Sequence, residues 1–239
     1  MASGNAPALT EDEYWRTFHL IRGDVEAAIK SNHAYLTINN LIVAEREIYA
    51  KVTRFPDFWK LNAYALQTTF FIAFGRIFDT RHDSLSIQRL VDATVGHPAF
   101  FSKAALRERK RKSANIYDGD PPWLVEYLQN TWEPTTVDLK PLKTALTPHY
   151  EKFKTIYKPI RHKTFAHRGI EDENAIAALF GKTLISDVSE ILRFLHTLLW
   201  TIRELAWNAK CPDLTDFSDY EVYVRNMNAK IEQFVRQLP

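Results

Sequence analysis

Residues 184–202 read LISDVSEILRFLHTLLWTI, and the pattern of this stretch decides the fold. Its apolar side chains recur every three or four residues, at Leu184, Val188, Ile191, Leu192, Leu195, Leu199 and Ile202. Because an α-helix turns once in about 3.6 residues, this spacing places them on one helical face. The stretch therefore predicts a long helix packed into a core that other helices must complete.

Helical patterns continue on both sides of this stretch. A helix is expected after Thr10, whose hydroxyl can accept a hydrogen bond from the first turn, and it should run to Ile29. Further helices are expected over residues 35–53, 57–79, 84–95, 99–115, 122–131, 135–150, 160–168 and 219–238. Residues 171–182 are irregular in pattern, with a short extended piece expected at 177–180. With 7 glycines and no repeat, the sequence predicts a single all-α bundle over residues 10–239, after a flexible arm at 1–9.

Composition excludes several classes of protein. Apolar residues make up 46% and charged residues 25%, as in folded globular chains. A net charge of +2 allows only a local nucleic-acid surface. The single cysteine, Cys211, excludes an internal disulfide and a thiolate-rich zinc site. The first residues lack a signal-peptide pattern and the most apolar window, 70–78, is too short to span a bilayer. We therefore expect a cytoplasmic protein without membrane association.

A concentrated set of polar side chains lies at residues 160–169, IRHKTFAHRG. On an α-helix, Arg161 and Arg168 would nearly eclipse, with Thr164 about 60° and His167 about 120° away. Nearby cations disfavour a further charge, so a low pKa is expected for His167, which suits a general base. A guanidinium suits a phosphate that gains charge. The segment thus has the groups needed for attack of a ribose 2′-OH on its neighbouring phosphate, although a solvated basic helix turn is the alternative.

Arg161, five intervening residues and His167 resemble the Arg-x(4–6)-His signature of HEPN domains. The preceding stretch AFGRIFDTRHDSLSIQRL, at residues 73–90, resembles the AbiU-like branch of abortive-infection proteins. That branch has an Arg-x-x-Asp pattern at a helix end, matched here by Arg76 and Asp79. The resemblance covers residues 10–210 and implies a four-helix core with additional helices.

HEPN domains often act as metal-independent endoribonucleases in defence and toxin–antitoxin systems, with two copies of the motif facing each other in a dimer. The resemblance implies a homodimer, RNA as substrate, an antitoxin protein as a further partner, and no cofactor or metal. It makes Arg161 and His167 the catalytic pair. Thr164 and Arg168 are supporting candidates because they share the helical arc of this pair, and His162 is a further supporting candidate. His162 stands where many members have Asn or Asp, which leaves its helper role open.

Two alternatives remain for the function of this segment. One is a non-catalytic HEPN-like module that binds RNA, a nucleotide or a protein partner through the same groove. The other is a structural helical protein in which Arg161 and His167 pair with acidic neighbours. The residues alone do not decide whether the chain is an enzyme.

Two other sets of charged residues are candidates. Arg76 and Asp79 lie three apart, so they can form an ion pair, or Asp79 can orient Arg161 while Arg76 supplements the phosphate contact. A basic run could follow RNA phosphates, or it could be a solvated helix end whose cations complement the helix dipole. Its cations are Arg107, Arg109, Lys110, Arg111 and Lys112.

Overall fold

The computed structural model describes residues 9–81, 84–166 and 178–238, and it confirms the all-α fold. Within these ranges the regular structure is entirely helical. The α-helices are α1 (Glu11–Ala44), α2 (Arg46–Val52), α3 (Pro56–Ile77), α4 (Ile87–Gly96), α5 (Lys103–Ser113), α6 (Pro122–Gln129), α7 (Thr136–Lys152), α8 (Lys158–Ile160), α10 (Ile185–Asn208) and α11 (Ser218–Arg236). A 3-10 helix, η1 (Pro98–Phe101), and two π-helices, η2 (Phe153–Tyr157) and η3 (Arg161–Ala166), complete the path.

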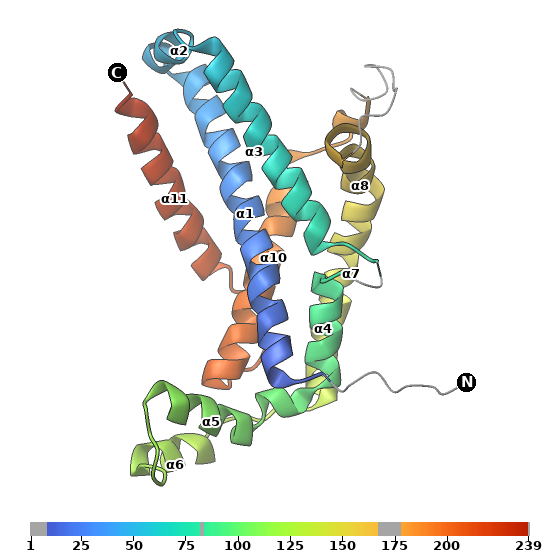
Figure 1. Cartoon of the computed structure of the whole chain (residues 1–239), viewed down its shortest axis with the longest axis vertical. Helices are drawn as coiled ribbons and strands as arrows, with labels where there is room; N and C mark the ends of the chain where they lie inside the picture. Colours follow the sequence, from blue (N-terminus) through green and yellow to red (C-terminus); the bar gives the residue numbers. More distant parts are fainter. Residues whose placement is uncertain (1–8, 82–83, 167–177, 239) are drawn as a thin grey trace, which may run out of the picture.

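The long apolar helix α10 lies at the centre, as its pattern predicts. Ile191, Leu192, Leu195 and Ile202 are fully buried, whereas Leu184, just before the helix, is 58% exposed. The main core joins α10 to side chains from α1, α3, α4 and α7. In Figure 1, α1 crosses α10, with α3 and α11 on either side of α1 and with α5 and α6 at one end of the bundle. No helix in the described ranges has the length and apolar character needed to cross a bilayer.

The first helix differs from its expected length. Thr10 caps it as predicted, since its hydroxyl accepts from the Glu13 amide and its own amide donates to the Glu13 carboxylate. The expected division near residues 30–35 is wrong, because α1 continues for 34 residues to Ala44. Ser31 in this region is a weak helix former but is 4% exposed, and its hydroxyl donates to the carbonyl of Ala27. Tertiary packing here overrides local propensity.

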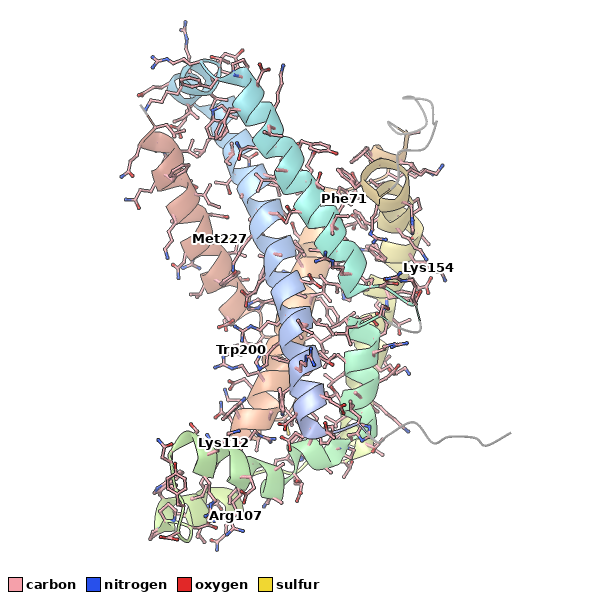
Figure 2. All side chains as sticks on the ribbon, in the orientation of Figure 1. Phe71, Arg107, Lys112, Lys154, Trp200 and Met227 are labelled. Atoms are coloured by element: carbon pink, nitrogen blue, oxygen red, sulfur yellow. The ribbon has the colours of Figure 1, made fainter. Side chains whose placement is uncertain are left out.

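Helix α3 and the path from α7 to η3 pack side by side and antiparallel (Figure 1). Phe71 stacks on Phe165 at 4.5 Å between ring centroids, and Phe78 stacks on Phe153 at 4.7 Å. Figure 2 shows Phe71 on the side of α3 that faces this path. Offset and edge contacts between aromatic rings stabilise beyond their buried area. The two contacts fix η3 along the second half of α3.

Pro159 changes the winding of the helix without ending it. Proline has no amide hydrogen for the carbonyl four residues earlier and its ring clashes there. The chain nevertheless stays helical from Thr136 to Ala166, with a π-helix on each side of α8. Since π-helices bond from i to i+5, the angles expected from α-helical geometry are wrong for residues 161–166. The extended piece expected at 177–180 is also wrong over 178–180, which form a helical turn.

Candidate functional site

The side chain of Arg161 lies directly on the backbone of α3 at Gly75. A Cβ atom added to Gly75 would lie 2.0 Å from Arg161 Nε and 2.2 Å from its Cδ. Real Cβ atoms do not approach other atoms so closely. Only glycine therefore allows Arg161 its position, and the neighbouring contact of Phe165 with Phe71 holds the helix that carries it.

Arg161 has no partner of its own among the described residues. Its Nε is buried without a hydrogen bond, and no hydrogen bond or ion pair of its guanidinium falls in these ranges. Arg161 acts electrostatically on Asp79, which lines the same pocket. Burial alone would raise the pKa of Asp79, but hydrogen bonds from Arg81 and the charges of Arg81 and Arg161 lower it below its ordinary value. A buried donor without a partner is costly, and such atoms often mark functional positions.

A pocket of about 390 Å³ opens beside Arg161. Such a volume is within the range of ligand sites. Three cations line it, and Asp79 is the carboxylate among its lining residues. The lining residues are Gly75, Phe78, Asp79, Thr80, Arg81, Phe153, Lys158, Arg161 and His162. The described walls therefore carry an excess of positive charge, which suits an anion.

The side chains of Arg76 and Asp79 bind different partners, although the Asp79 amide donates to the Arg76 carbonyl. Arg76 pairs with Asp24 of α1, with 3.5 Å between Nη1 and Oδ1. Asp79 follows the end of α3 and accepts from the amide and the Nε of Arg81, both at 3.1 Å. The expected ion pair between Arg76 and Asp79 is therefore wrong. Asp79 lies in the pocket with Arg161, whereas Arg76 is outside its lining.

The remaining residues of the motif are placed as follows. Thr164 is half-buried, and its hydroxyl has no hydrogen-bond partner. His162 is exposed and lines the pocket. His167 and Arg168, and the helix end expected at Gly169, lie outside the described residues. Arg161 is thus the member of the expected catalytic pair that lies within the described residues. Its contact with Gly75 of α3 is formed within a single chain.

The basic run lies on α5, at the other end of the bundle from η3 (Figure 1). Arg109 turns inward, where its guanidinium donates to the carbonyls of Ala206 and Phe100 and pairs with Glu11. Arg107 and Arg111 both pair with Asp120 of the following loop.

The other two cations of the run differ in their surroundings. Lys110 lies over the ring of Tyr127, and Lys112, labelled in Figure 2, is exposed. The run is therefore not a uniform solvated row of five cations. Its proposed role in RNA binding rests mainly on its outward members.

Sequence reasoning missed two residues of this site, Gly75 and Lys158. Gly75 lies among aromatic residues in a segment predicted to be helical. Because glycine lowers helix stability, its presence there indicated a structural role for this position. Nothing in the local sequence distinguishes Lys158 from the other lysines of the same helical path. The described ranges hold no group of three or more His, Cys, Asp and Glu side chains placed for a metal ion.

The chain matches a known protein family over most of its length. The HEPN-domain family model described as AbiU2 matches residues 9–210, which include Gly75, Asp79 and Arg161. No curated protein and no solved structure matches the chain. The match covers most of the sequence and confirms the resemblance seen in residues 73–90 and 160–169. The chain belongs to the AbiU2 family of HEPN domains.

Proposed function

We propose that this chain is a metal-independent endoribonuclease of the prokaryotic defence or toxin type, acting in the cytoplasm. One observation carries the proposal: Arg161 is held against Gly75, has no partner in the described protein, and borders a positively charged pocket. A structural arginine would use its donors within the fold, as Arg109 does. An arginine held in place without a partner suits an anion that arrives from outside.

The chemistry follows from the groups in the motif. His167 accepts the proton of a ribose 2′-OH, and the 2′ oxygen forms a bond to the adjacent phosphorus. The bond from phosphorus to the 5′ oxygen breaks, and that oxygen takes a proton. Arg161 stabilises the charge that gathers on the non-bridging oxygens of the phosphorane. The products are a 2′,3′-cyclic phosphate and a 5′-hydroxyl end.

We further propose that the active form is a homodimer in which two motif helices face each other. Each site would then contain Arg161 and His167 from both chains. Sedimentation should give twice the mass of one chain at the protein concentration at which RNA is cleaved. A monomer with full activity would refute the dimer without refuting the nuclease.

The test is cleavage of a mixed set of RNAs by purified protein in excess EDTA. The wild-type protein should cleave, and Arg161→Ala and His167→Ala should not. Arg225→Ala is the matched control, because Arg225 is exposed on α11 and far along the chain from the motif. Binding of RNA by the wild-type protein with no cleavage of any RNA would refute the nuclease and assign the chain as a non-catalytic binding module.

A further inference from the structure

The pocket beside Arg161 has a second cation, Lys158, whose side chain has no partner among the described residues. This residue lies in α8, three positions before Arg161, and its side chain is exposed. Within the described ranges the side chain of Lys158 forms no hydrogen bond or ion pair, and its backbone bonds are those of the helix. It is not part of the Arg-x(4–6)-His signature, so the proposed reaction gives it no role.

The cations of this pocket differ in how deeply they are buried and in whether they form an ion pair. Arg161 is the inner one, since its Nε is buried and its stem rests on Gly75. Arg81 also lines the pocket and is 73% exposed, but its Nε is bound to Asp79. Lys158 is the outer cation of the pocket, and it forms no ion pair with any residue that the structure describes. A compact ammonium on a flexible stem can follow an anion that lies nearer the solvent.

The different depths of Lys158 and Arg161 suit two neighbouring anions. The Nε of Arg161 is buried, whereas the side chain of Lys158 is exposed. Gly75 prevents the stem of Arg161 from moving inward, and the flexible Lys158 side chain can extend outward. A single RNA strand offers one phosphate at every nucleotide, so two neighbouring phosphates can be met at two depths.

We propose that Lys158 binds the phosphate that neighbours the scissile phosphate along the RNA strand, while Arg161 engages the scissile one. This rests on the proposed function for the identity of the inner phosphate. Lys158 is then a substrate-binding residue that makes the site prefer RNA with at least two consecutive phosphates. A free phosphate or a single-phosphate dinucleotide occupies only the inner position.

The test uses short RNAs that cannot be cleaved because every 2′-OH is methylated. Binding of a dinucleotide with one phosphate and of a trinucleotide with two is measured by NMR titration, with inorganic phosphate as a third probe. In the wild-type protein the second phosphate should strengthen binding about fivefold, the upper value for one solvent-exposed ion pair. In Lys158→Gln this gain should disappear, and the affinity for the dinucleotide and for inorganic phosphate should stay within twofold.

The matched control is Lys140→Gln, which removes the same charge from an exposed position on α7. Lys140→Gln should keep the gain from the second phosphate. For an uncleavable longer strand, the slope of log affinity against log salt should fall by about 0.7 in Lys158→Gln, the value for one lost contact to single-stranded nucleic acid. An equal loss of slope in Lys140→Gln would overturn the assignment, because it would show a general charge effect.

The result separates this inference from the proposed activity. Loss of the second-phosphate gain in Lys158→Gln, together with no cleavage of unmethylated RNA by wild-type protein, would support the binding site and refute the nuclease. An undiminished gain in Lys158→Gln would refute the role of Lys158, whatever the activity.

Discussion

Replacing Gly75 by alanine adds a single methyl group and so tests the close contact between Arg161 and Gly75. The added Cβ would lie 2.0 Å from Nε, 2.2 Å from Cδ and 2.8 Å from Cζ of Arg161. Since contacts under 3.0 Å essentially do not occur, Arg161 has to move by about 1 Å or more. The Arg161 side chain is the group that can move, because Gly75 is buried in the last turn of α3.

The expected cost falls on activity more than on stability. A displacement of about 1 Å at a catalytic group can lower the rate about 100-fold, so Gly75→Ala should lose about two orders of magnitude in kcat. Alanine favours a helix interior over glycine by about 0.8–1 kcal/mol. That gain offsets part of the strain, and the free energy of unfolding should change by less than about 1 kcal/mol.

The assay combines single-turnover cleavage with urea denaturation. Gly23→Ala is the matched control, because a Cβ at Gly23, inside α1, meets no atom within 4 Å. It should gain stability and keep full activity. Adding Gly75→Ala to Arg161→Ala should raise the free energy of unfolding as Gly23→Ala does, because the clashing side chain is gone. If Gly75→Ala kept wild-type activity and gained as much stability as Gly23→Ala, the close contact between Arg161 and Gly75 would be refuted.

Three further perturbations follow from the contacts. Phe165→Ala removes the ring stacked on Phe71 and should lower the free energy of unfolding by about 2 kcal/mol. This is less than for a fully buried phenylalanine, because Phe165 is half-buried. An unchanged urea midpoint would contradict this packing. In the same assay, Arg109→Ala should lower the free energy of unfolding by about 2–4 kcal/mol, because it leaves buried carbonyls without a donor. Lys112→Ala should change it by less than about 0.5 kcal/mol. Equal effects would contradict the inward role of Arg109. Asp79 has a lowered pKa in the folded protein, so its carboxylate stabilises the fold above the ordinary pKa of about 3.9. This contribution is lost as the pH falls. The difference in Tm between wild type and Asp79→Asn should therefore shrink below about pH 4.

The sequence predicted the elements whose signals are local. The apolar spacing of residues 184–202 identified α10, since every third or fourth side chain there is buried. The capping box at Thr10 fixed the start of α1, because its two hydrogen bonds involve neighbouring residues only. Segment 160–169 was recognised by residue type and spacing, and the family match agrees with it.

The features that the sequence did not predict depend on distant contacts or on backbone geometry. The continuation of α1 past Ser31 depends on burial against other helices. The π-helical winding around Pro159 changes the direction of Arg161, and α-helical angles could not anticipate it. The contact of Arg161 with Gly75 joins residues 86 positions apart in the chain, and only the antiparallel packing of α3 and η3 brings them together.

The most direct test of the central claim is the fate of one mapped cleavage site when its 2′-OH is replaced by hydrogen. In EDTA, the wild-type protein should cut the normal RNA at that site and leave a 2′,3′-cyclic phosphate detectable by mass spectrometry. It should leave the 2′-deoxy version intact there while cutting the other sites, and Arg161→Ala should cut neither. Equal cleavage of the 2′-deoxy site, or a product without the cyclic phosphate, would contradict the role assigned to the Arg161 site.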